Sequence, residues 1–149
     1  MSYNDVLKWL TKEFGYPVPT EYLSFLQEGD FISTARLFYI IDRETETLLE
    51  ISDWFTYDNL ISVYRNCCDE KMIEKHHLPI FDSCACTVVI DCDPNATTYG
   101  QVFVRTPTGY FDEALQENVY FESSYVAKNF SAILSNLHTI EDLEKMGID

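Results

Sequence analysis

The sequence lacks any apolar run approaching the roughly 18 residues that a membrane-spanning helix needs. Its first residues include Asn4, Asp5 and Lys8 in place of the basic and apolar stretch of a secretory signal peptide. Internal repeats, low-complexity tracts and linkers are also missing. We therefore expect one domain over residues 1–149, located in the cytoplasm and without a membrane partner.

Basic residues are scarce. The chain has 10 Lys and Arg against 25 Asp and Glu, which gives a formal net charge of −15. Nucleic acids and anionic lipids are bound through clusters of Lys and Arg, so this charge argues against both partners. The same field speeds encounter with a basic protein, although solubility alone explains the charge equally well.

Cysteines are too few and too poorly spaced for a disulfide framework. There are 5, an odd number, and Cys67 and Cys68 are adjacent. This pattern favours a reducing cytoplasm. Apolar residues make up 46% of the chain and aromatic residues 15%, enough to form a hydrophobic core.

Apolar residues three and four positions apart predict helices at both ends and in the middle of the chain. Asp58 is placed to cap the middle helix, and Ser123 or Ser124 the next one. Thr139 is placed to cap the last helix, which Gly147 ends. The predicted helices span residues 3–14, 19–29, 58–77, 125–137 and 139–147.

Runs of β-branched, aromatic and large aliphatic residues predict strands. The first two strands flank a polar segment, residues 42–47, and form a hairpin. Residues 110–117 fit either an irregular loop or an edge strand. The order of elements predicts an α+β fold with a central, mainly antiparallel sheet flanked by helices. The predicted strands span residues 35–41, 48–51, 78–81, 84–92, 101–105 and 119–121.

Six potential metal ligands lie close together in the sequence. Zinc sites usually take paired cysteines from a turn with two to four residues between them, a spacing that is missing here. Cys84 and Cys86 instead alternate with Val88 and Ile90 on one apolar strand face, so we interpret the thiols as core and expect no cofactor. The six residues are Cys67, Cys68, His76, His77, Cys84 and Cys86.

Two alternatives in which the chain is an enzyme have little support from the sequence. A thiol nucleophile needs a neighbouring base such as His76, His77 or His138, but no local signature supports such a pair. Neighbouring carboxylates such as Asp112 and Glu113 are expected by coincidence in so acidic a chain. We therefore expect no enzymatic activity, and a small metal or thiol enzyme remains the least favoured function.

Residues 91–95 resemble the start of a calcium-binding EF-hand loop. Asp91, Asp93 and Asn95 match its first three ligand positions. The pattern then fails, because Ala96 and Val102 stand where the loop requires Gly and Glu. A turn that joins two strands explains the same residues.

Acidic and aromatic residues are interleaved in residues 43–65 and 105–128. Protein interfaces combine aromatic anchors with charges that steer association. The alternative is that the rings belong to the core and the acids to a solvated face. The residues that we predict to contact a partner are Trp54, Tyr57, Asp58, Asp112, Glu113 and Glu117.

Three stretches of the chain resemble the SUKH superfamily, which includes many bacterial immunity proteins and the Knr-type regulators of fungal cell-wall synthesis. Residues 18–30, VPTEYLSFLQEGD, look like its opening helix. Residues 78–81, 84–92 and 101–105 are similar to its central sheet, and residues 125–137 look like its closing helix. Asp82-Ser83-Cys84 replaces the usual glycine-rich turn, and Arg105-Thr106 replaces a Trp-Asp pair, as in a divergent member.

The resemblance implies a mixed α+β fold, no cofactor and a role as an inhibitor. Bacterial members bind a cognate toxin, often a nuclease, inside the producing cell. Such toxins are commonly basic because they must bind the phosphate groups of nucleic acid. The family alternative is a regulatory scaffold of the cell-wall type. Neither the partner nor the oligomeric state follows from the sequence.

Overall fold

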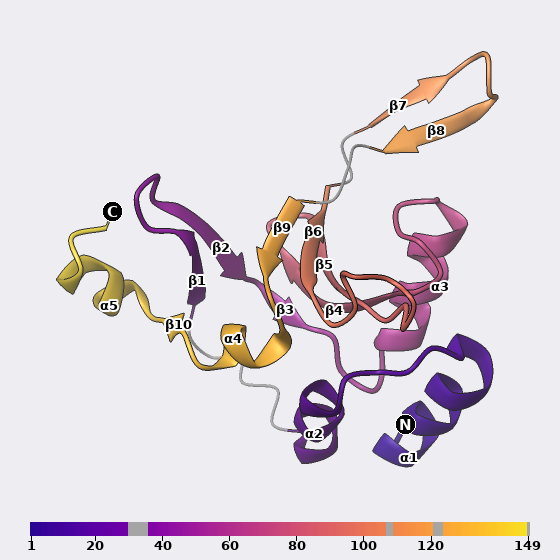
Figure 1. Ribbon diagram of the computed structural model, residues 1–149, viewed down its shortest axis with the longest axis horizontal. Helices are drawn as coiled ribbons and strands as arrows, with labels where there is room; N and C mark the ends of the chain where they lie inside the picture. The colour runs from indigo at the N-terminus through magenta and orange to yellow at the C-terminus, as the bar shows by residue number, and fades with distance from the viewer. Residues whose placement is uncertain (30–35, 107–108, 121–123, 149) are drawn as a thin grey trace.

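The computed structural model describes residues 1–29, 36–106, 109–120 and 124–148. It has the predicted α+β fold, with helices and antiparallel sheets (Figure 1). In the part of the chain that the structure describes, none of the helices combines the length and the apolar character needed to cross a bilayer. The predictions made for Ala35, Pro107, Phe121 and Ser123 lie outside the described residues.

Two helical segments open the chain, as the sequence predicts. α1 (Tyr3–Trp9) continues into a π-helical turn, η1 (Leu10–Phe14), and ends at Gly15. α2 (Thr20–Glu28) ends at Gly29, whose backbone adopts a left-handed φ of 66°. Glycine adopts this conformation without steric cost, which explains the helix stop.

A three-stranded antiparallel sheet contains the predicted hairpin. A small core of Phe38, Leu143 and Ile148 joins this sheet to α5 (Ile140–Lys145), which begins after the predicted cap Thr139. The strands of the sheet, in spatial order, are β10 (Leu137–His138), β1 (Leu37–Asp42) and β2 (Thr47–Ile51).

A five-stranded antiparallel sheet forms the centre of the molecule. The chain enters it from β2 through Ser52, whose amide donates to the carbonyl of Asp82 at 2.8 Å. Cys84 and Ala85 both have a positive φ and form the tight turn of its central hairpin. The strands, in spatial order, are β3 (Asp53–Trp54), β4 (His77–Ser83), β5 (Cys86–Asp91), β6 (Val102–Arg105) and β9 (Ser124–Ala127).

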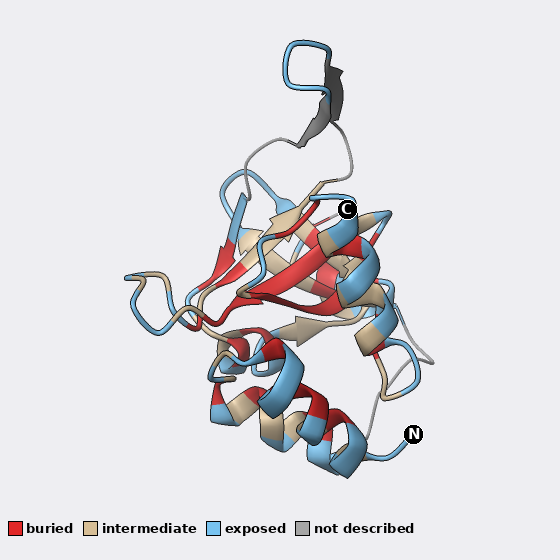
Figure 2. Ribbon diagram, turned by 90° about the vertical axis from the view of Figure 1, so that its right-hand side faces the viewer, coloured by how far each residue is buried: buried red, intermediate tan, exposed pale blue. Residues whose placement is uncertain are grey.

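Both faces of the five-stranded sheet are covered, so its central strands are buried (Figure 2). Val88 and Ile90 of β5 face the main core, together with residues of α1, α2 and α4 (Phe130–Leu134). Val89 points to the opposite face, where Cys67 packs beside it in a smaller cluster. Burial on both faces is typical of the most stable part of a fold.

The middle helix is shorter than predicted. It is α3 (Leu60–Asp69), with Asn59 at the N-cap position. Asp58, the predicted cap, lies one residue before this position, and its carboxylate contacts the amino group of Met1 at 3.4 Å. At the other end Lys71 adopts a positive φ of 58°, which stops the helix before His77 opens β4.

The closing helix predicted over residues 125–137 is wrong. Ser124 caps no helix, because it lies in β9, which adds to the edge of the five-stranded sheet. Only α4 is helical in this stretch, and its cap is Asn129, whose Oδ1 accepts from the amide of Ala132 at 2.8 Å. On either side of α4, β9 pairs with β6, and Leu137 pairs with β1.

Candidate functional site

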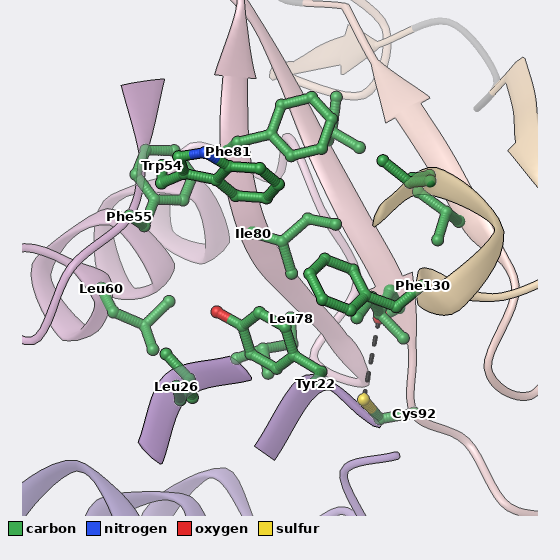
Figure 3. Packing of buried hydrophobic residues seen from close by; sticks show 14 of the residues in the cluster. Tyr22, Leu26, Trp54, Phe55, Leu60, Leu78, Ile80, Phe81, Cys92 and Phe130 are labelled. Carbon is green, nitrogen blue, oxygen red and sulfur yellow. Dashed lines mark hydrogen bonds between the residues drawn. The ribbon is translucent and has the colours of Figure 1, made fainter. Parts of the chain in front are cut away.

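The residues predicted to contact a partner fall in different environments. Trp54 is 6% exposed, and its ring lies 4.8 Å from that of Phe25 and 5.1 Å from that of Phe81 (Figure 3). These distances are typical of packed aromatic pairs in a core. The structure therefore corrects the assignment of Trp54, which belongs to the hydrophobic core and not to a contact surface.

Tyr57 is half-buried and contacts both N-terminal helices, α1 and α2. Its hydroxyl donates a hydrogen bond to the carbonyl of Leu26, and its ring lies 6.3 Å from that of Tyr3. Asp58, the next residue, has a side chain that is 83% exposed. Of these two neighbours, Asp58 is the one whose charged group is exposed.

The segment that fitted either a loop or a strand forms a separate hairpin. It consists of β7 (Gly109–Asp112) and β8 (Glu117–Tyr120), in which Asp112 lies opposite Glu117. For Asp112 and Glu117 the structure describes the backbone pairing alone. In Figure 1 this hairpin stands away from the five-stranded sheet.

The tip of the β7–β8 hairpin, residues 113–116, is exposed throughout. Glu113 supplies a carboxylate, and Leu115 is 61% exposed. Gln116 closes the turn with a positive φ of 55°, and its side-chain amide donates to the carbonyl of Glu113 at 2.7 Å. The tip therefore presents an apolar side chain and one carboxylate in a defined turn.

The predicted contact residues do not form one surface. Asp58 lies beside the amino terminus, whereas Glu113 lies at the hairpin tip, and Figures 1 and 2 place these two features at opposite ends of the molecule. Leu115, which the structure exposes at the tip, is not among the predicted contact residues. Its signal was a large apolar residue within a short polar turn.

Further carboxylates gather where β2 passes into β3. Asp53 is exposed and lies directly opposite Asp82 in the β3–β4 ladder. Burial, and then the charge of Asp53, raise the pKa of Asp82. Nearby, a hydrogen bond from Arg36 at 2.8 Å lowers the pKa of Glu50. This edge of the sheet adds to the negative surface.

Four of the five thiols lie in environments that raise their pKa. Burial raises the pKa of Cys67, Cys68 and Cys92. Cys84 is exposed in the β4–β5 turn, which corrects its predicted place on the buried strand face. A hydrogen bond to the Glu50 carboxylate raises its pKa as well, which disfavours the reactive thiolate.

Two histidines meet an aspartate at the end of the central hairpin. His77 lies opposite Asp91 in the β4–β5 ladder, and His76 Nδ1 lies 3.0 Å from Asp91 Oδ1. Burial, and then the charges of His76 and Arg105, lower the pKa of His77 to about 4. None of the cysteines that the sequence grouped with these histidines belongs to this cluster.

Asp91 is held by the turn that follows it. Burial acts to raise the pKa of Asp91, but hydrogen bonds from Thr98, the Asp93 amide and His76 outweigh burial and lower it. Asp93 in turn accepts from the amide of Asn95 at 3.0 Å. These bonds form the strand-joining turn that the sequence analysis preferred to a calcium loop.

The described residues define an α+β protein of antiparallel sheets that is acidic overall and has two of its five thiols buried. The family model described as SMI1 / KNR4 family (SUKH-1) matches residues 4–136, and the chain belongs to this family. The resemblance to SUKH proteins is thereby confirmed. A search of curated proteins gave no match. β10 and α5 lie beyond the matched residues.

Proposed function

We propose that this chain is an acidic protein-binding module that acts as an immunity protein inside the cell that produces its cognate toxin. Family membership over residues 4–136 supports this proposal, as does the net charge of −15. The toxin would be a basic domain, such as a nuclease. The chain would inhibit it by occupying the surface that binds its substrate.

The single observation that carries the proposal is the exposed tip of the β7–β8 hairpin. Leu115 offers an apolar anchor that is 61% exposed, and Glu113 is an exposed carboxylate two residues before it. Interfaces gain most of their affinity from a few anchors that become buried, while surrounding charges set the rate of association. In this proposal the hairpin tip enters the substrate-binding groove of the toxin.

The charge of the proposed partner follows from its substrate. An enzyme that acts on nucleic acid presents Lys and Arg to phosphate groups. Carboxylates from an inhibitor compete for the same cations, and complementary potentials raise association rates by roughly 10 to 1000-fold. Inhibition by this route depends on ionic strength, since salt screens charges over about 8 Å at physiological concentration.

The first test is whether a neighbouring gene encodes a toxin domain, and that domain is then purified and mixed with this chain. Calorimetry should show a complex whose affinity falls as salt rises, and the bound toxin should lose activity on its substrate. Leu115→Ser should weaken binding by about 2 kcal/mol if Leu115 is an anchor. Glu113→Lys should also weaken it.

Glu44→Lys is the matched control for Glu113→Lys. Residues 43–46 form a turn of the same length in the β1–β2 hairpin, and its fourth residue, Glu46, has a φ of 52° where Gln116 has 55°. Equal weakening by both charge changes would show that overall charge, and not the β7–β8 tip, drives binding. Binding that leaves the toxin active would exclude the immunity role.

A further inference from the structure

Two imidazoles and one carboxylate converge at the end of the β4–β5 hairpin. His76 and His77 precede and begin β4, Asp91 ends β5, and one ligand atom from each lies within 4.8 Å of the others. The two imidazole rings are 4.6 Å apart and nearly perpendicular, at 74°. We propose that His76, His77 and Asp91 bind one divalent transition-metal ion of the zinc type.

The donor set suits such an ion. Two imidazole nitrogens and one carboxylate oxygen occur together in zinc sites and in other sites for divalent metals of the first transition row. Two ligands at about 2.1 Å from one zinc ion lie roughly 3.0–3.4 Å from each other. His76 Nδ1 and Asp91 Oδ1 are 3.0 Å apart, which lies within this range, and an ion bound between them requires His76 to carry its hydrogen on Nε2.

The carboxylate is already held in place. The side chain of Asp91 is 4% exposed, its Oδ2 accepts from the Thr98 hydroxyl, and its Oδ1 also accepts from the Asp93 amide at 2.9 Å. Hydrogen bonds of this kind orient the ligands of natural metal sites. The amide of Cys92 donates to the carbonyl of His76 at 2.8 Å, which fixes the backbone on the opposite side.

The cluster reaches solvent at His76, whose side chain is 30% exposed. Tyr16 packs edge-on against it, with the ring centroids 6.2 Å apart. His77 is the residue that must adjust. Its Nδ1 accepts from the amide of Glu74 at 3.2 Å, so coordination by this neutral ring breaks that bond. Because Glu74 is exposed, the released amide can turn to water.

The experiment uses untagged chain stripped with chelator and then titrated with Zn²⁺ in the presence of a competing indicator. One Zn²⁺ should bind per chain, with a rise in the thermal midpoint that grows with the logarithm of Zn²⁺ concentration. Co²⁺ should give the visible bands of nitrogen and oxygen coordination without a thiolate-to-cobalt band.

His76→Gln and Asp91→Asn test the assignment. Each should weaken Zn²⁺ binding beyond the roughly 10–100-fold that loss of an outer partner of a metal ligand costs. His138→Gln and Cys84→Ser are matched controls, because these residues lie outside the cluster. Circular dichroism checks that each variant folds. If Asp91→Asn does not fold, His76→Gln alone tests the assignment, because His76 is the more exposed of the two residues.

Three results would overturn the proposal. They are no stoichiometric Zn²⁺ binding at micromolar concentration, binding unchanged in both His76→Gln and Asp91→Asn, and a thiolate-to-cobalt band that Cys84→Ser abolishes. Loss in His76→Gln with retention in His138→Gln supports the site.

Discussion

Asp53 and Asp82 lie directly opposite one another in the antiparallel ladder between β3 and β4. Like charges opposite each other in a ladder destabilise it by a few tenths to about 1 kcal/mol. Burial, and then the neighbouring Asp53, raise the pKa of Asp82. The pair therefore weakens the fold at neutral pH while it increases the negative potential at the sheet edge.

Removing the charge of Asp82 should stabilise the protein. Asp82→Asn is expected to raise the free energy of unfolding at pH 7 by a few tenths to about 1 kcal/mol, a range limited by the partial exposure of Asp82. Asp53→Asn should give part of the same gain, because it removes the second cause of the shift. Urea unfolding of each variant measures both effects.

The sign of the pH dependence follows from the raised pKa of Asp82. The folded state holds this proton more tightly than the unfolded state, whose carboxyl has the ordinary value of 3.8. Wild-type stability from Asp82 therefore rises as pH falls through the folded pKa towards 3.8. The advantage of Asp82→Asn should shrink over the same interval, and an advantage that grows instead would contradict the assignment.

Substitutions of Trp54 and Leu115 should differ in their effect on the stability of the protein. Trp54→Ala removes a core ring that is 6% exposed and should lower the free energy of unfolding by about 3–5 kcal/mol. Leu115→Ala, at a site 61% exposed, should change it by less than about 0.5 kcal/mol. Chemical denaturation measures both values. A small decrease in the free energy of unfolding of Trp54→Ala would contradict its assignment to the core and favour a role in partner contact.

Local patterns predicted the fold where local interactions decide the structure. The helices over residues 3–14 and 19–29 and the β1–β2 hairpin follow from apolar spacing and from stops that lie nearby. The stretch 125–137 has helical spacing too. Its first residues nevertheless form β9, because β6 offers an unpaired edge on which Tyr125 lies opposite Phe103. This long-range pairing overrides local preference.

The candidate sites depend on register, which the sequence did not reveal. The pairing of His77 with Asp91 follows from a turn at Cys84 and Ala85, two residues with positive φ that are not glycine. A strand predicted to start at Cys84 hid that turn and therefore the cluster. Acidity was visible in the composition, but which acids face a partner depends on how the β7–β8 hairpin is presented.

Gly29 and Gly147 form a matched pair for testing how α2 is fixed. Both have a positive φ, 66° and 78°, where an alanine costs roughly 1–2 kcal/mol. A Cβ at Gly29 would also lie 3.2 Å from the hydroxyl of Tyr57, whereas nothing lies within 4 Å at Gly147. Gly29→Ala should therefore destabilise the protein more than Gly147→Ala, as measured by thermal unfolding.

The Tyr57→Phe background isolates this contact. Removing the hydroxyl should reduce the extra cost of Gly29→Ala while leaving that of Gly147→Ala unchanged. A double-mutant cycle measures the difference as a coupling energy. Zero coupling would mean that the two substitutions act only through the left-handed backbone, and that Tyr57 does not constrain the end of α2.

Cys84 should be the cysteine whose reactivity depends on one neighbouring charge. It is exposed, and its Sγ lies 3.3 Å from Glu50 Oε2, a hydrogen bond that raises the thiol pKa above the ordinary 9.0. Because the thiolate is the nucleophile, alkylation at pH 8 should be slow despite the exposure. Glu50→Gln removes the carboxylate charge, which should lower the pKa of Cys84 and shift its rate profile to lower pH. Mass spectrometry after iodoacetamide treatment measures the alkylation of Cys84, while buried Cys92 should stay unlabelled until the protein unfolds.

Glu46→Gln makes the same charge change at an exposed turn. An equal shift in that variant would assign the effect to overall charge and not to the hydrogen bond.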